Sequence, residues 1–176
     1  LFDEVASACN RLQMDYYKAT GDDKACLDIL KLLLPFATST DLRQSIEKDI
    51  SETCTRLTLS AVSEQLRPIH TLCEEATEAA EAKPASADQQ AHRILSAAPQ
   101  LLSNLSNDGL PRDVIDRATD KAALAVMHCA VVFGNKTEKW KACITILERS
   151  LRLAVSADVK SRVIKNLQTV QENAPY

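Results

Sequence analysis

Few side chains in this sequence have the spacing that chemistry requires. His70 and Cys73 are three residues apart, which would place both on one face of a helix and offer half of a zinc site. A complete site needs two more ligands, and the sequence has no Cys-x-x-Cys or His-x-x-x-His pair. His128 and Cys129 are adjacent, so their side chains would point to different faces of a helix. This pattern favours core cysteines and partly exposed histidines over a metal centre.

The six cysteines are predicted to be reduced core residues. Each lies within a helical segment, mostly among apolar neighbours, and their positions are Cys9, Cys26, Cys54, Cys73, Cys129 and Cys143. Free cysteine behaves as a small hydrophobic residue, and a chain of 176 residues is well above the size that needs disulfides for stability. This interpretation places the chain in the cytoplasm.

Other catalytic arrangements find little support in the sequence. Its three glycines are isolated, at Gly21, Gly109 and Gly134. They cannot form a phosphate-binding loop. Four acids cluster at Glu74, Glu75, Glu78 and Glu81. Such a run is typical of a solvated helix face rather than of paired catalytic carboxylates. A Cys–His nucleophile pair would also need an orienting group and an oxyanion hole. We therefore expect no enzymatic activity and no cofactor.

The segment 136–165 is basic, with eight basic and three acidic residues and a net charge of +5. A basic face beside an aromatic residue such as Trp140 is typical of nucleic-acid binding. The basic residues are spread around two helices, however, and the whole chain has a net charge of −3 and a pI near 5.7. Nucleic-acid binding is therefore disfavoured, and we interpret Trp140 as a packing residue at the start of its helix.

The composition indicates an all-α fold. The chain has only 3 glycines, 6 prolines and 4% aromatic residues, whereas sheets need glycine turns and aromatic faces. It has no run of 18 apolar residues that would span a membrane. It begins at Leu1 rather than at a methionine, so we expect a domain excised from a longer protein. Residues 1–82 contain 15 acids and 8 bases, a net charge of −7, and residues 83–176 contain 9 acids and 13 bases, a net charge of +4.

Apolar spacings of three and four predict a series of helices. They span 2–18, 23–37, 41–66, 68–82, 87–106, 112–133, 137–155 and 158–173. In the first of these the apolar face comprises Phe2, Val5, Ala6, Cys9, Leu12 and Tyr16. Pro68 should restart or bend the third helix, and Pro99 should split or kink the segment 87–106. The segment 112–133 is nearly all apolar in its second part, which predicts a central position. A linker that begins at Lys83 divides the chain into 1–82 and 83–176, within one continuous domain.

The strongest signal in the sequence is an internal repeat. The stretch from Lys24 to Ile50 returns 117 residues later as the stretch from Lys141 to Leu167, with 10 identities in 27 positions and no gap. Both copies contain Lys-Ala-Cys-x-x-Ile-Leu, and both contain Ser-x-Asp before the following helix. Shared helical periodicity would match apolar classes but not these identities. With the helices 2–18 and 112–133 added, each copy becomes a three-helix unit.

These helix–turn–helix units resemble the tetratricopeptide-like α-solenoid superfamily, and the resemblance covers 24–50 and 141–167. The family's Trp-Leu-Gly-Tyr signature is absent, so the resemblance is one of architecture and transfers no binding residue. It implies a helical repeat of antiparallel helix pairs, arranged as a solenoid or a compact bundle. We expect a non-catalytic scaffold that binds a protein or peptide. The alternative is a structural or oligomerisation segment of a larger chaperone, regulatory protein or enzyme.

Overall fold

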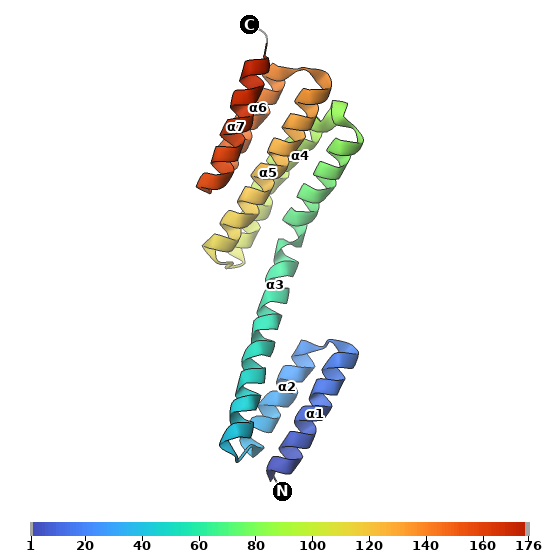
Figure 1. The fold of residues 1–176 in the computed structure, drawn as a ribbon, viewed down its shortest axis with the longest axis vertical. Coiled ribbons are helices and arrows are strands. Elements are labelled where there is room, and N and C mark those ends of the chain that lie inside the picture. Colours follow the sequence, from blue (N-terminus) through green and yellow to red (C-terminus); the bar gives the residue numbers. More distant parts are fainter. Residues whose placement is uncertain (1, 175–176) are drawn as a thin grey trace. The chain divides into compact units, whose positions relative to one another are not determined.

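The protein is helical throughout the part of the chain that the computed structural model describes, residues 2–174 (Figure 1). Its α-helices are α1 (Phe2–Thr20), α2 (Asp23–Leu33), α3 (Thr40–Ala82), α4 (Ala87–Asn107), α5 (Arg112–Thr137), α6 (Trp140–Leu153) and α7 (Ala157–Asn173). Two 3₁₀ turns, η1 (Leu34–Phe36) and η2 (Pro84–Ser86), separate α2 from α3 and α3 from α4. The predicted all-α class is confirmed. No helix within the described residues is long and apolar enough to cross a membrane.

The chain forms two compact units that divide between Glu64 and Gln65, inside α3. The sequence had suggested a division between 82 and 83 instead. The difference arises because the second part of α3 belongs to the core that follows it: Ile69, Leu72 and Cys73 are buried, and Cys129 Sγ of α5 lies 3.8 Å from the carbonyl oxygen of Ala76. We call residues up to Glu64 unit 1 and residues from Gln65 unit 2.

Unit 1 contains α1, α2, η1 and the first part of α3. Its core consists of buried side chains from α2, the turn after η1 and α3, namely Leu30, Leu33, Ala37 and Ile46. α2 ends at Leu33, before the predicted end at 37, because Pro35 cannot continue the helix and lies in the 3₁₀ turn η1. From α1 only Ala6 and Gln13 are buried.

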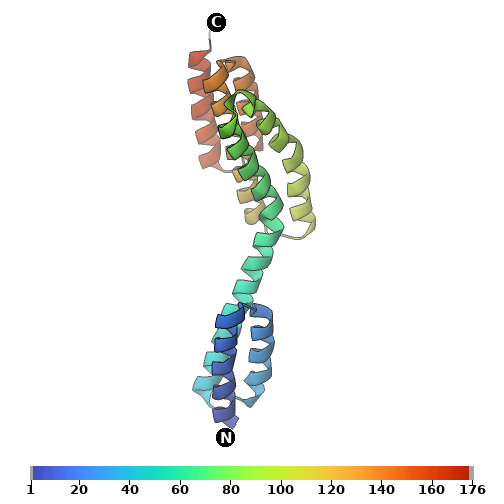
Figure 2. The same ribbon diagram turned by 90° about the vertical axis from the view of Figure 1, so that its right-hand side faces the viewer.

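Unit 2 is built around α5, which contacts α4, α6 and α7 (Figures 1 and 2). The predicted central position of this helix is therefore confirmed within unit 2. Many of its buried residues are small: Ala118, Ala122, Ala123, Ala125, Cys129, Ala130 and Gly134. Small side chains let neighbouring helices approach closely. At Gly134 an added Cβ would lie 3.0 Å from both Cys143 Sγ and the Trp140 ring.

The two internal prolines do not interrupt their helices. α3 runs through Pro68 and α4 runs through Pro99, so the predicted restart at Pro68 and the predicted split at Pro99 are wrong. Each proline removes one backbone hydrogen bond. In both helices burial continues past the proline, at Ile69 in α3 and at Leu105 in α4. This burial offsets the lost bond.

The turns after α1 and α5 have the same geometry. Gly21 and Glu138, which lie 117 residues apart, both have positive φ angles, of 66° and 55°. Gly21 N donates to Tyr17 O at 2.7 Å, and Glu138 N donates to Gly134 O at 2.8 Å. α5 therefore extends three residues beyond Gly134, where the sequence had placed its end, and α6 starts at Trp140 rather than at 137.

In each unit one carboxylate joins a helix to the turn before the second helix after it, α1 to the start of α3 and α5 to the start of α7. In unit 1 the Asp3 carboxylate of α1 accepts hydrogen bonds from Thr38 N at 2.7 Å and Ser39 N at 3.1 Å, in the turn that precedes α3. In unit 2 the Asp120 carboxylate of α5 accepts from Val155 N at 2.7 Å and Ser156 N at 3.2 Å, in the turn that precedes α7. Donors and acceptors are again 117 residues apart. These bonds satisfy backbone groups that a helix start leaves unpaired.

We expect Asp120→Asn to lower the free energy of unfolding of unit 2 by about 1 kcal/mol at pH 7. Burial alone would raise the pKa of Asp120, but the hydrogen bonds from Ser156 and Val155 together lower it below its ordinary value. The Asp120 carboxylate thus contributes fully to the free energy of unfolding above about pH 4, the pKa of an unfolded aspartate. This contribution is lost as the pH falls through the lower pKa that Asp120 has in the folded protein.

Trp140 is the only tryptophan and lies in unit 2, so its fluorescence during urea unfolding measures this difference. Asp3→Asn is the matched control, because it removes the same bonds in unit 1 and should leave the Trp140 transition unchanged. A difference between wild type and Asp120→Asn that is as large at pH 2.5 as at pH 7 would contradict the assignment.

Glu138→Gly should stabilise unit 2 by about 1 kcal/mol, because a residue with a Cβ pays a comparable cost in the left-handed region and glycine does not. Gly21 already occupies the corresponding position in unit 1. The same urea titration measures the gain. Glu138→Ala retains the Cβ and should show no gain, so equal stabilisation by both substitutions would refute the backbone explanation.

Candidate functional site

The possible half of a zinc site lies on α3, with Cys73 buried and His70 partly exposed. Burial raises the pKa of the Cys73 thiol to about 11. Burial and then the nearby Lys121 lower the pKa of His70. Across residues 2–174 no three histidine, cysteine, aspartate or glutamate side chains are placed to hold a metal ion together. The structure therefore brings no further ligands to this pair.

All six cysteines are free, and four of them are buried as predicted: Cys26, Cys73, Cys129 and Cys143. Cys9 is half-buried and Cys54 is exposed, so the prediction of a core position is wrong for Cys54. Its position on α3 matches the apolar spacing of Ile46 and Ile50, but at this turn of the helix the neighbouring Thr53 is buried and Cys54 is exposed. Burial raises the pKa values of Cys129 and Cys143 to about 11. A thiol with such a pKa is a poor nucleophile at neutral pH.

His128 and Cys129 point in different directions, as predicted for neighbours on a helix. Cys129 is fully buried, whereas the His128 ring is half-exposed and its Nε2 lies 3.1 Å from Glu81 Oε1. The arrangement is a surface contact between α5 and α3, and Cys129 takes no part in it.

The acidic run on α3 is exposed, as predicted, but it is also paired with basic residues on other helices. Glu74 Oε1 lies 2.7 Å from Lys121 Nζ of α5, and Glu75 Oε2 lies 2.7 Å from Arg93 Nη2 of α4. The Lys121 ammonium, through its hydrogen bond and its charge, lowers the pKa of Glu74. The sequence could not reveal these partners, because they lie 47 and 18 residues away.

The basic residues of 136–165 do not converge on one site. Most are exposed, and they are distributed over the end of α5, over α6 and over α7. Arg149 of α6 contacts His92 of α4, with 3.2 Å between Nη1 and Nδ1. Trp140 is half-buried beside Gly134, which agrees with its interpretation as a packing residue.

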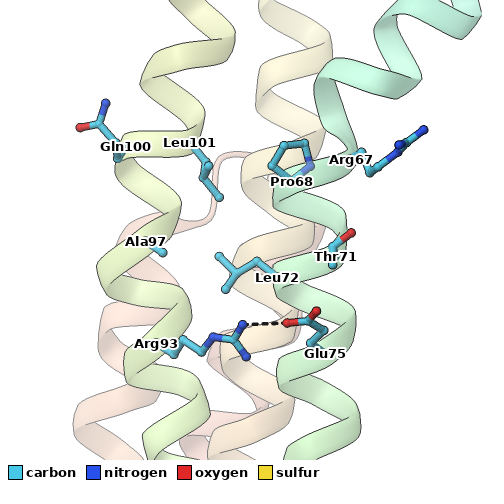
Figure 3. A pocket seen from close by; sticks show the side chains of 9 residues that line it. All are labelled: Arg67, Pro68, Thr71, Leu72, Glu75, Arg93, Ala97, Gln100 and Leu101. Carbon is cyan, nitrogen blue, oxygen red and sulfur yellow. Dashed lines mark hydrogen bonds and ion pairs between the residues drawn. The ribbon is translucent and has the colours of Figure 1, made fainter.

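An open groove of about 560 Å³ separates α3 from α4 within unit 2 (Figure 3). Its apolar lining is formed by Pro68 and Leu72 of α3 and by Ala97 and Leu101 of α4. Figure 3 shows the side chains of Leu72 and Leu101 directed towards each other between the two helices. The groove is therefore a cleft with an apolar floor, which is the usual form of a binding site for an apolar side chain.

Polar side chains surround this apolar floor: Arg67, Thr71, Glu75, Arg93 and Gln100. Arg93 reaches across to Glu75 at one end, whereas Arg67 and Gln100 extend outward from the helices (Figure 3). None of these residues was singled out from the sequence as a site residue except Glu75, as part of the acidic run. The available signal was the spacing of Ala97 and Leu101, two half-buried apolar residues four positions apart, and it becomes informative only once α4 is known to lie beside α3.

Comparisons with known proteins give no relative: no family model, curated protein or solved structure matches the chain.

The three thiols with raised pKa values should resist alkylation in the folded protein. At pH 8 a pKa of about 11 leaves roughly 0.1% thiolate, and burial blocks access as well. Iodoacetamide should therefore label Cys54 first, and it should label Cys73, Cys129 and Cys143 only after unfolding. Mass spectrometry of tryptic peptides measures this order, with Cys54→Ser as the control that removes the fast site. Rapid labelling of Cys73 in the folded chain would instead identify an activated thiol.

Proposed function

We propose that this chain is a non-catalytic helical scaffold that binds a protein or peptide partner. The observation that carries the proposal is the groove between α3 and α4, which combines an apolar floor with charged groups at its edge. Its volume of about 560 Å³ lies within the range of ligand pockets and is sufficient for one or two apolar side chains of a partner. The six free cysteines support a place in the reducing cytoplasm.

The chemistry of the groove favours an apolar residue followed or preceded by an acidic one. The apolar side chain would pack between Leu72 and Leu101. A carboxylate nearby would compete with Glu75 for the Arg93 guanidinium. The existing pair costs little to replace, because both side chains are about half-exposed, at 49% and 53%, and exposed ion pairs contribute little stability.

We further propose that the scaffold arose from two copies of a three-helix unit, α1–α3 and α5–α7, with the antiparallel helix pairs of tetratricopeptide-like α-solenoids. Identical hydrogen bonds 117 residues apart support this interpretation. Besides the Asp3 and Asp120 contacts, Thr20 Oγ1 donates to Tyr16 O and Thr137 Oγ1 donates to Phe133 O, both at 2.8 Å. The aligned residues Cys26 and Cys143 are both fully buried.

A structural or oligomerisation role is the second candidate. It is favoured by a separate observation, the row of large apolar residues that α1 exposes in unit 1. A nucleic-acid partner receives no comparable support, because the basic residues are dispersed over three helices.

Selection of random displayed peptides against the immobilised chain should enrich sequences that carry an apolar residue next to aspartate or glutamate. The selected peptides should bind the Ala97→Trp variant at least tenfold more weakly than wild type, because the indole fills the space between Leu72 and Leu101. Arg93→Glu should weaken the binding of the acidic peptides in particular. Fluorescence anisotropy with labelled peptides gives the dissociation constants.

Ser103→Trp is the matched control, since Ser103 is exposed on α4 and does not line the groove. Circular dichroism establishes that each variant is folded. Peptides that bind wild type and Ala97→Trp equally well would place the binding surface elsewhere and refute the proposed site.

A further inference from the structure

The helix α1 exposes most of the apolar face that the sequence predicts for it. Phe2 is 62% exposed, Val5 54%, Leu12 68% and Tyr16 41%, and Cys9 is half-buried among them. We call these five residues the α1 seam. Their spacing alternates between three and four residues, which is the spacing of the contact line of a coiled coil. Beside the seam lies an apolar groove of about 420 Å³, between α1 and the end of α2, that reaches Leu33 and the exposed Phe36.

Unit 2 reveals what covers the corresponding face of α5. The residues 117 positions after Val5, Leu12 and Tyr16 are Ala122, Cys129 and Phe133, and all three are buried. There α4 packs along α5 and also contacts α6, while the second part of α3 contributes the Ala76 contact to Cys129. The short turn 108–111 joins α4 to α5, so these two helices run antiparallel. In unit 2 the face that corresponds to the seam is thus covered by two helices, α4, which runs antiparallel to α5, and the second part of α3.

The seam is complementary to itself in the antiparallel direction. When a second α1 is laid against the first, Val5 faces Tyr16, and Cys9 faces Leu12, in one common register. In this register every seam residue from Val5 to Tyr16 meets an apolar residue of the other copy.

The exposed apolar area is large enough for a specific contact. Fully exposed aromatic side chains present about 200 Å² each, so the seam together with Phe36 exposes on the order of 600 Å² per copy. Such a patch reaches the upper limit for monomeric proteins. Complete burial of this patch on two copies would remove at most about 1,200 Å² from water, close to the roughly 1,000 Å² that specific interfaces require.

We propose that the α1 seam is the contact surface between two copies of this chain, which associate through a twofold axis with their α1 helices antiparallel. Each α1 then takes on the other copy the position that α4 has against α5 in unit 2. This inference does not rest on the proposed peptide binding, because the peptide groove lies between α3 and α4. Ala97→Trp should therefore leave the association unchanged.

Analytical ultracentrifugation of the chain from 1 µM to 1 mM tests the association. Wild type should show a monomer–dimer equilibrium, and Leu12→Glu should weaken it at least about 100-fold, because each dimer would bury two carboxylates. Leu59→Glu is the control: Leu59 is also an exposed leucine of unit 1, at 64%, but lies on α3 outside the seam. A wild type that stays monomeric at 1 mM, or a Leu59→Glu variant as impaired as Leu12→Glu, would overturn the proposal.

Disulfide trapping tests the orientation. In a Cys54→Ser background, Leu12→Cys places a thiol opposite Cys9 of the other copy, so mild oxidation should yield a dimer linked through Cys9. The control Met14→Cys, in the same background, places the thiol on α1 but outside the seam, and it should give much less disulfide-linked dimer. Peptide mapping identifies the linked residues. Disulfides that join Cys9 to Cys9, or the introduced thiol to itself, would indicate parallel helices and overturn the antiparallel arrangement.

Discussion

In both helix triplets, α1–α3 and α5–α7, one carboxylate holds the first helix to the start of the third. Asp3 and Asp120 accept backbone amide hydrogens that would otherwise lack partners at the turn before α3 and before α7. The contact joins the first helix to a turn 35 residues away, and it therefore limits how the first helix and the third can lie relative to each other. A capping bond of this kind contributes specificity of arrangement as well as stability.

The parts of the fold that depend on local chemistry could be predicted from the sequence, and those that depend on packing could not. Gly21 marked the end of the first helix because a left-handed turn needs no Cβ, and Ser156 marked the start of the last because its hydroxyl accepts from Val159 N. At Pro68 the helix does not restart. Whether a proline ends a helix depends on how much apolar surface the following turns bury, and residues far along the chain decide that.

The candidate sites show the same division. The hydrophobic spacing predicted which residues of α1 share a face. It could not predict that most of this face stays exposed in unit 1. Likewise Glu75 was visible only as one acid in a run. Its partner Arg93 and the groove between Leu72 and Leu101 exist because α4 packs beside α3. No short-range pattern encodes that pairing, and no relative is available to indicate it.

The helices α1 and α5 differ in residue size at two of the aligned positions on this face. α5 has Ala122 and Cys129 at the positions where α1 has Val5 and Leu12. Small residues allow α4 and the second part of α3 to approach α5 closely, and the chain itself supplies those helices. Large residues in the same places would hold such helices apart, but they suit side chains that interdigitate across a looser contact. Under the duplication that we propose, one copy of the three-helix unit would serve internal packing, and the other would provide the contact surface that we propose between two chains.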